Sequence, residues 1–160
     1  MAESDRARIL IVDDDPLVIE GLQRQLHAQF DVTGTTQPKE ALKLVVTQGP
    51  YAVVVSDLRM PGMDGIALLY SIRKLSPDTV RVLLTGYADV EAATAAVNEG
   101  NIFRFLTKPC PTKTIIRALE ASVAQHRNIT AERALLEQTL CASLKTLTEI
   151  RARVKKTSDP

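Results

Sequence analysis

The sequence has few of the features that mark secreted, disulfide-bonded or membrane-spanning proteins. It contains two cysteines, Cys110 and Cys141, which lie far apart with neither a C-x-x-C pair nor a neighbouring histidine. We therefore interpret both as reduced thiols without a role. Residues 1–8 are polar, and the apolar run that follows, residues 9–12, is too short for a signal peptide or a membrane span. We expect a cytoplasmic protein that does not enter a membrane.

An excess of charge of either sign is also absent. The 160 residues carry a formal net charge of +1, with 45% hydrophobic and 24% charged residues. This composition is typical of a folded globular chain, and its length suits one compact domain with an appendage. A nearly neutral chain is not expected to work by neutralising nucleic-acid phosphates. We interpret the C-terminal cations as a solvated helix end and not as a nucleic-acid contact: Arg151, Arg153, Lys155 and Lys156.

Short apolar runs alternate with longer amphipathic stretches, a pattern typical of a parallel sheet with crossover helices. Residues 52–56 are apolar almost throughout and predict a central strand, whereas 30–34 and 102–106 alternate and predict edge strands. Two polar-striped strands around three apolar ones match an α/β fold with a doubly wound, flavodoxin-like sheet of five parallel strands in the order 2-1-3-4-5. The expected strands are 8–12, 30–34, 52–56, 80–84 and 102–106, and the expected helices are about 16–27, 38–47, 65–75 and 89–98, with Asp15 and Asp89 as caps of the first and fourth.

Glycine and proline are absent from residues 112–159, where Ala, Leu, Glu, Lys, Arg and Gln dominate. This composition predicts a long C-terminal helical extension, either one helix or two in line with a hinge at 128–130. Its second half carries one apolar stripe, which on a solitary helix would remain exposed to water. We expect the stripe to pair with another copy of the chain or with an adjacent domain, although His126, Thr130 and Arg133 interrupt a strict coiled-coil register. The stripe comprises Leu136, Leu140, Leu144, Leu147, Ile150 and Val154.

Polar and charged side chains occur where four of the expected strands end. Asp13 and Asp14 follow the first strand, Asp57 the third, Thr85 the fourth and Lys108 the fifth. Because the first and third strands are neighbours in the expected order, their three carboxylates should converge at one edge of the sheet. Crowded carboxylates favour a bound cation, and Mg²⁺ prefers oxygen ligands. A hydroxyl and an ammonium at the same edge can bind phosphoryl oxygens, so the set predicts a phosphoryl-transfer site.

The motifs around these residues resemble the CheY-like receiver domain of bacterial two-component response regulators, over residues 9–119. The resemblance implies that residues 1–125 form a receiver domain and that 126–160 form a helical extension or linker able to pair as a coiled coil. Four motifs carry it: Ile-Val-Asp-Asp-Asp at 11–15, Ser-Asp-Leu-Arg-Met-Pro-Gly-Met-Asp-Gly at 56–65, Leu-Leu-Thr-Gly at 83–86 and Phe-Arg-Phe-Leu-Thr-Lys-Pro at 103–109.

The resemblance further implies the chemistry of the site. Asp57 would accept a phosphoryl group from a sensor histidine kinase or a phosphotransfer protein. Mg²⁺ would be the cofactor, bound by Asp57, directly by Asp14 and mostly through water by Asp13. The backbone carbonyl of Arg59 would be a further ligand. Self-phosphorylation and autodephosphorylation would be the only chemistry of these residues.

By the same resemblance, Thr85 and Lys108 would hold the phosphoryl oxygens, and Phe105 would be the switch residue. Thr85 would move toward the phosphoryl group while Phe105 turns inward, which changes the surface built from the fourth helix, the fifth strand and the last helix. That surface and the helical extension would then control homodimerisation or an output partner.

Two further side chains are predicted to overhang the site. Arg59 lies two residues after Asp57, and Tyr87 lies two residues after Thr85. Bulky groups at these positions would obstruct an attacking water molecule and lengthen the lifetime of the phosphoryl group.

The output of such a regulator has several interpretations. Residues 131–150 are similar to the linker that joins receivers to HD-type output domains, which include the HD-GYP cyclic-di-GMP phosphodiesterases. The sequence contains neither an HD dipeptide nor a Gly-Tyr-Pro motif, and it has no room for a helix-turn-helix module. The chain would therefore be either a receiver fragment of a longer regulator or a single-domain regulator with a residual linker.

Two interpretations from other classes remain. A haloacid-dehalogenase phosphatase also uses an aspartyl nucleophile with Mg²⁺, but its motif requires Thr or Val two residues after the second aspartate. Here Asp13 and Asp15 are followed by Pro16 and Leu17, and Asp57 would have no role. An adaptor with a vestigial site is the other alternative, and it is weakened because every site residue is of the competent type.

Overall fold

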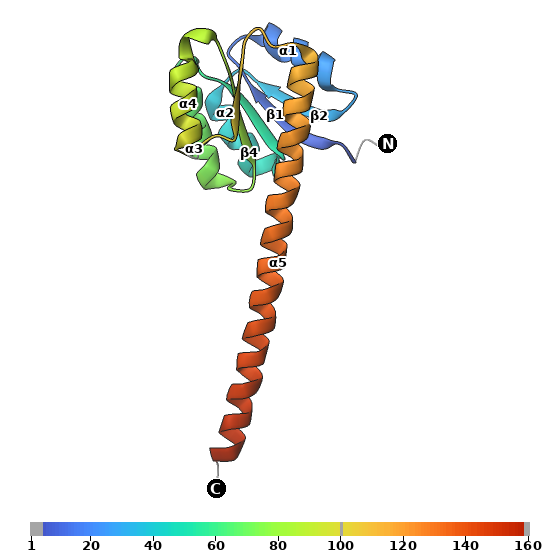
Figure 1. The fold of residues 1–160 in the computed structure, drawn as a ribbon, viewed down its shortest axis with the longest axis vertical. Coiled ribbons are helices and arrows are strands. Elements are labelled where there is room, and N and C mark those ends of the chain that lie inside the picture. The colour runs from blue at the N-terminus through green and yellow to red at the C-terminus, as the bar shows by residue number, and fades with distance from the viewer. Residues whose placement is uncertain (1–4, 100, 159–160) are drawn as a thin grey trace. The chain divides into compact units, whose positions relative to one another are not determined.

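The computed structural model describes residues 5–99 and 101–158, except for the side chain of Tyr87. Strands and helices alternate along the chain, as the sequence predicts (Figure 1). The strands are β1 (Ala7–Val12), β2 (Phe30–Thr35), β3 (Val53–Asp57), β4 (Val80–Thr85) and β5 (Arg104–Thr107). The helices are α1 (Pro16–Leu26), α2 (Pro38–Gln48), α3 (Gly65–Leu75), the 3₁₀ helix η2 (Tyr87–Asp89), α4 (Val90–Asn98) and α5 (Thr112–Ser158).

The five strands form one sheet in the order β2-β1-β3-β4-β5, with every neighbouring pair parallel. This confirms the predicted doubly wound topology, with β3 in the centre and β2 and β5 at the edges. The register pairs Val12 with Ser56 and Asp57 with Leu84. The chain that leaves β1 at Asp13 therefore starts beside Asp57, at the carboxyl edge where this fold binds ligands.

Apolar side chains on the central strands fix this arrangement. Leu10, Val54 and Leu83 belong to a buried cluster with the apolar residues of α2, α3 and α4. Their neighbours along the strands alternate in direction, and residues such as Ile9 and Val53 are buried as well, so the sheet is covered on both faces. Apolar residues of α1 and of the first turns of α5 are also buried: Ile19, Leu22, Leu26, Ile115, Leu119 and Val123.

Element boundaries differ slightly from the prediction, most of all at β5. This strand begins at Arg104 and not at residue 102, because residues 101–103 form the turn that leads out of α4. The side chain of Arg81 binds the Asn101 carbonyl at 2.8 Å, and the Phe103 amide donates to the Arg81 carbonyl at 2.7 Å. Elsewhere β3 runs one residue further and includes Asp57 itself. The helix α4 ends at Asn98, as predicted, and Gly100, the glycine that follows the predicted helix, lies outside the described residues.

The two predicted caps behave differently. The Asp15 carboxylate accepts a hydrogen bond from the Leu17 amide at 2.9 Å and caps α1 as expected. Asp89 occupies the N-cap position of α4, but its side chain makes no capping hydrogen bond, so this prediction is wrong. The reason is a competing partner, because the Asp89 carboxylate binds the guanidinium of Arg59.

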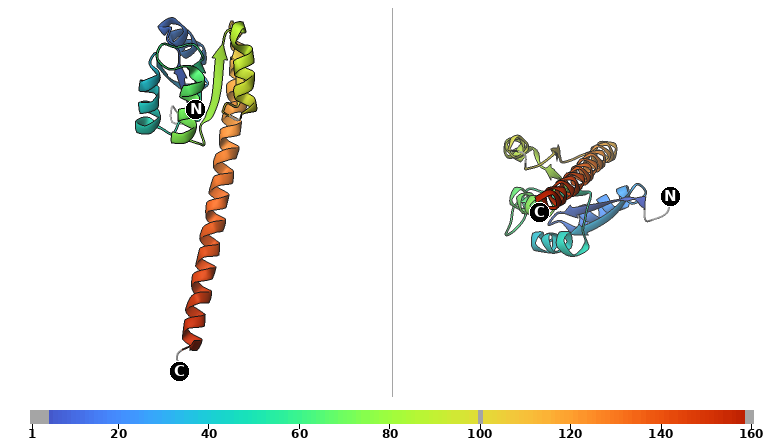
Figure 2. Two further views of the ribbon diagram at one scale, coloured as in Figure 1. Left: turned by 90° about the vertical axis from the view of Figure 1, so that its left-hand side faces the viewer. Right: turned by 90° about the horizontal axis from the view of Figure 1, so that it is seen from below.

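The C-terminal part of the chain is one uninterrupted helix, α5, which remains helical through residues 128–130 (Figure 2). Of the two predicted alternatives, this confirms one long helix and excludes two helices with a hinge at 128–130. The chain divides into two compact units, Met1–His126 and Arg127–Pro160. In the second unit, the six side chains of the apolar stripe are between 51% and 64% exposed. Among the described residues, no helix has the length and apolarity needed to cross a membrane.

Candidate functional site

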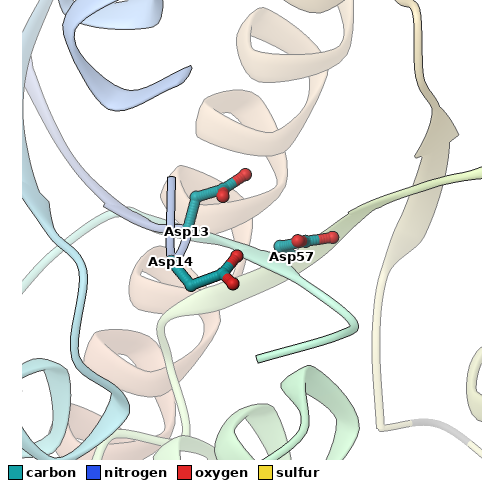
Figure 3. A group of neighbouring side chains, drawn as sticks. All are labelled: Asp13, Asp14 and Asp57. Atoms are coloured by element: carbon teal, nitrogen blue, oxygen red, sulfur yellow. The ribbon is translucent and has the colours of Figure 1, made fainter. Parts of the chain in front are cut away.

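Three carboxylates from two neighbouring strands meet at the carboxyl edge of the sheet (Figure 3). Asp13 and Asp14 directly follow β1, and Asp57 is the last residue of β3. One carboxylate oxygen of each lies within 4.8 Å of those of the other two. Asp13 is buried, Asp14 is exposed and Asp57 is intermediate, so the cluster opens to solvent on one side. The convergence predicted from strand order is thus present in the structure.

Backbone and side-chain hydrogen bonds hold the inner carboxylate in place. Asp13 is 3% exposed, and its Oδ1 accepts a hydrogen bond from the Asp15 amide at 2.9 Å. Its Oδ2 accepts one from Lys108 Nζ at 2.8 Å. Because a buried charge is tolerated only when it is paired, Lys108 is the group that permits a carboxylate at this depth.

The Asp57 carboxylate accepts fewer hydrogen bonds that compensate its charge than the Asp13 carboxylate does. Its Oδ1 accepts a hydrogen bond from the Leu58 amide at 2.8 Å, and its Oδ2 lies 3.5 Å from Lys108 Nζ. Burial raises the pKa of Asp57 and the charge of Asp13 adds to the rise, which together outweigh the lowering by Lys108 and by the Leu58 amide. The negative charge of Asp57 is therefore incompletely neutralised by the protein.

A close backbone approach fixes the loop that follows Asp57. The amide of Gly65, the first residue of α3, donates to the Leu58 carbonyl at 2.8 Å. A Cβ atom on Gly65 would lie 2.0 Å from the carbonyl oxygen of Asp57. Only glycine permits α3 to begin this close to the strand end, so residue 65 sets the position of the Asp57 backbone.

Lys108 reaches the acidic cluster from the end of β5. Its amide donates to the Thr85 carbonyl at 2.7 Å, and the Lys108–Pro109 peptide bond is cis. Burial alone would lower the pKa of Lys108, but the hydrogen bond and charge of Asp13, with a contribution from Asp57, outweigh it and raise the pKa. The ammonium is therefore a fixed positive charge between the two carboxylates.

Thr85, the last residue of β4, is 1% exposed. Its hydroxyl oxygen is buried and makes no hydrogen bond with the described residues. Burying a hydroxyl without a partner costs about 1–3 kcal/mol. A group of this kind at the carboxyl edge fits a hydroxyl that donates to an oxygen-rich ligand.

The remaining predicted residues lie around this edge. Phe105 in β5 is half-buried and packs against the core cluster that contains α4 residues. The Arg59 side chain is 78% exposed and its guanidinium binds Asp89. Its predicted position over the site remains a prediction. The side chain of Tyr87 lies outside the described part of the structure. Its predicted position over the site remains a prediction.

The ion pair between Asp89 and Arg59 is not predicted from the sequence. An aspartate at the start of a helix is a common cap, so the sequence pattern predicts a capping role for Asp89. The available signal was a cation two residues after Asp57 and an acid four residues after Thr85, on loops at the same sheet edge.

The donor set fits a magnesium ion. Mg²⁺ takes oxygen ligands and is commonly held by one or two carboxylates. The three carboxylates supply clustered oxygen donors, and burial, with a smaller contribution from the Asp13 charge, raises the pKa of Asp57; a bound divalent cation would favour its ionised form.

Comparison with known families identifies the domain. Residues 9–120 match the family model of the response regulator receiver domain. The hydrogenase transcriptional regulatory protein HoxA of Cupriavidus necator is 34% identical over 118 residues, covering 74% of this chain and 24% of the relative. The C4-dicarboxylate transport transcriptional regulatory protein DctD of Pseudomonas aeruginosa is 33% identical over 137 residues, covering 83% and 29%. The chain thus spans about a quarter of the length of these relatives.

Solved structures show the same fold. A structure of adenylate cyclase from Rhodopirellula baltica is 40% identical, with a TM-score of 0.81, covering 82% of this chain and 98% of that chain. The signal receiver domain of an HD domain-containing protein from Pseudomonas fluorescens Pf-5 is 31% identical, with a TM-score of 0.71, covering 77% and 98%.

These relatives carry different outputs, so the similarity of residues 131–150 to HD-type linkers does not favour an HD-GYP regulator over other receiver proteins. The haloacid-dehalogenase alternative has no support, because the match includes Asp57 and its flanking motif, which that mechanism leaves without a role. The match over residues 9–120, together with the sheet order and the acidic cluster, places the chain in the family of receiver domains of two-component response regulators.

Proposed function

We propose that Asp57 accepts a phosphoryl group from the phosphohistidine of a sensor histidine kinase or a phosphotransfer protein. A carboxylate oxygen of Asp57 attacks phosphorus in line, the P–N bond to the histidine breaks, and the imidazole leaves with the electron pair. The observation that carries this proposal is the convergence of Asp57 with two carboxylates, a lysine and a buried hydroxyl at one sheet edge. Residues 1–125 act as the receiver, and 126–160 act as the helical extension.

Asp13, Asp14 and Asp57 would hold Mg²⁺, with the backbone carbonyl of Arg59 as a further ligand. When bound, Mg²⁺ neutralises charge on the phosphoryl oxygens. Asp13 and Asp14 keep the donor set in place, and the incompletely neutralised charge of Asp57 attracts the cation.

Lys108 and Thr85 would bind the transferred group. The Lys108 ammonium lies 3.5 Å from Asp57 Oδ2, and this distance supports a role in binding the new acyl phosphate. The Thr85 hydroxyl would gain the partner that it lacks among the described residues. We propose that its movement toward the phosphoryl group, with Phe105 turning inward, changes the surface formed by α4, β5 and the start of α5.

For the output, we propose that the stripe on α5 pairs with a second copy of the chain, alone or together with the α4-β5-α5 surface. The exposed apolar side chains of residues 127–158 support this, because a helix gains stability by burying such a stripe. A C-terminal output domain, as the curated relatives carry, is the second candidate partner. We propose no separate output enzyme within these 160 residues.

The lifetime of the acyl phosphate is a finer part of the proposal. Arg59 and Tyr87 would slow hydrolysis by obstructing the attacking water. If so, Arg59→Ala and Tyr87→Ala each increase the dephosphorylation rate of labelled protein. Unchanged rates in both variants would remove this role.

Labelling and sedimentation test the main proposal. With Mg²⁺, acetyl phosphate should label the chain, and Asp57→Ala should not be labelled. Sedimentation velocity with Mg²⁺ and beryllofluoride should shift monomer to dimer in a way that requires Asp57. An unlabelled parent chain would support the adaptor alternative, and a dimer under every condition would make the extension a constitutive clamp.

A further inference from the structure

A two-pronged ion pair joins the loop after β3 to the end of η2. Arg59 Nε lies 3.0 Å and 2.9 Å from the two carboxylate oxygens of Asp89, and its Nη2 lies 2.6 Å from Oδ1. The two residues are 30 positions apart in the chain. The Asp89 side chain is 12% exposed, whereas that of Arg59 is 78% exposed. The exposed side chain of Arg59 is therefore held by the Asp89 carboxylate, which is mostly shielded from solvent.

This pair gives the guanidinium of Arg59 a partner outside the acidic cluster. Arg59 is two residues from Asp57, yet its guanidinium forms its ion pair with Asp89, at 2.6 Å. The cation beside Asp57 is Lys108, whose Nζ lies 3.5 Å from Oδ2 of Asp57.

Asp89 does not make the capping hydrogen bond that its position before α4 would allow. It stands at the N-cap of α4, where an aspartate ordinarily accepts a backbone hydrogen bond, but it makes none. The ion pair with Arg59 therefore links Asp89, the residue before α4, to the loop that follows Asp57. Because Asp89 is four residues from Thr85, the same tie restrains the segment through which Thr85 must move.

We infer that Asp89 is a positioning residue that holds the Arg59 guanidinium away from Asp57 until a phosphoryl group competes for it. The inference rests on the proposed phosphoryl acceptance by Asp57. A phosphoryl group presents more negative charge and more acceptor oxygens than a carboxylate, so the guanidinium has a reason to exchange partners. The exchange frees the segment from Thr85 to Asp89. Because the guanidinium has to leave Asp89 in order to bind the phosphoryl group, the pair opposes that exchange.

Calorimetric titration of the full chain with beryllofluoride and saturating Mg²⁺ tests this. Asp89→Asn should bind about two- to five-fold more tightly than wild type, the range expected for loss of one exposed ion pair. Asp89→Glu should restore affinity close to the wild-type value, since it restores the charge. Higher salt should reduce the difference between wild type and Asp89→Asn, because salt screens an ion pair at the surface.

A double-variant comparison separates an action through Arg59 from a general effect. In an Arg59→Gln background, Asp89→Asn should produce no further change in affinity. Glu91→Gln is the matched control, because it removes the same charge from the first turn of α4 and makes no ion pair with the described residues. It should bind like wild type. Additive effects of the Arg59 and Asp89 substitutions would overturn the inference.

Two results distinguish this inference from the proposed function. If wild type fails to bind beryllofluoride, phosphoryl acceptance by Asp57 fails, and the inference fails with it. If wild type binds and Asp89→Asn binds equally well, the inference alone is wrong. Circular dichroism melting of each variant without Mg²⁺ confirms that the compared chains are folded.

Discussion

Asp57 and Lys108 set the charge of the acidic cluster. The ammonium forms its short contact, 2.8 Å, with Asp13 and its longer one, 3.5 Å, with Asp57. One ammonium group thus lies beside two carboxylates, and it is farther from Asp57 than from Asp13. This imbalance explains why burial can raise the pKa of Asp57 despite a neighbouring lysine.

The imbalance makes Asp57 a destabilising residue at neutral pH. A carboxyl whose pKa is raised by folding opposes folding once it is ionised, and the penalty disappears as the pH falls through the raised pKa toward 3.8. We expect Asp57→Asn to melt a few degrees higher than wild type at pH 7 in EDTA. The difference should shrink with acidification and vanish below about pH 3.8. Thermal melting across pH measures it, and a variant less stable than wild type at pH 7 would contradict the pKa direction.

Magnesium should act on the same residues. A ligand that binds only the folded chain raises stability by RT ln(1 + [L]/Kd), which is about 1.4 kcal/mol at ten times Kd. We expect Mg²⁺ to raise the melting temperature of wild type, and Asp13→Asn or Asp14→Asn to abolish most of the rise. Glu120→Gln, which removes an exposed acid from α5, is the control and should keep it. An equal rise in all four proteins would place the ion elsewhere.

At the scale of elements, the junction of β3 and α3 decides where Asp57 stands. Gly65 allows the helix to begin against the strand end, and Asp64 caps it by accepting a hydrogen bond from the Ala67 amide at 2.7 Å. The helix start and the strand end thus share one rigid corner, and the phosphoacceptor belongs to it.

A methyl group should disturb this corner. Gly65→Ala places a Cβ 2.0 Å from the Asp57 carbonyl oxygen, which is backbone and cannot rotate away. We expect a loss of about 1–3 kcal/mol in urea unfolding. Gly21→Ala is the matched control, because its Cβ would meet no atom within 4 Å in the middle of α1. It should be neutral or stabilising by up to about 1 kcal/mol. Equal changes in the free energy of unfolding for the two variants would show that a Cβ at residue 65 fits beside the Asp57 carbonyl.

At the scale of the whole molecule, the extension is a structural unit of its own. Residues 127–160 separate from the receiver unit, and their apolar stripe is more than half exposed. Exposed leucines at helical spacing need a partner surface, whereas the receiver already has a complete core. Pairing through the extension should therefore be separable from the stability of the receiver.

Substitution within the stripe tests this separation. Leu140→Glu with Leu147→Glu should abolish the dimer that we expect in sedimentation velocity, because it places charges in the apolar contact. The melting temperature of the receiver unit should not change. Gln138→Glu with Lys145→Gln is the control, since it alters net charge equally on the opposite side of the helix and should leave the dimer intact. A dimer that survives the leucine substitutions would shift the contact to the α4-β5-α5 surface.

The strand order and the positions of the reactive residue types could be predicted from sequence patterns alone. Strand and helix periodicities are local, so the sheet, its edges and a long helical extension could be predicted within a few residues. The convergence of the strand-end side chains could also be predicted, because parallel strands bring their carboxyl ends to one edge of the sheet. A weak break in helix propensity at 128–130 suggested a hinge that the structure lacks.

The partner that each side chain takes depends on tertiary contacts. The Asp89 carboxylate binds Arg59 and not the amides of α4. Lys108 forms its shorter contact with Asp13, and the Thr85 hydroxyl is buried without a hydrogen bond to the described residues. These choices depend on distances between segments far apart in the chain, and several partners of suitable charge compete for each group. Local sequence fixes the candidates for each contact, and packing of the strand ends against one another selects among them.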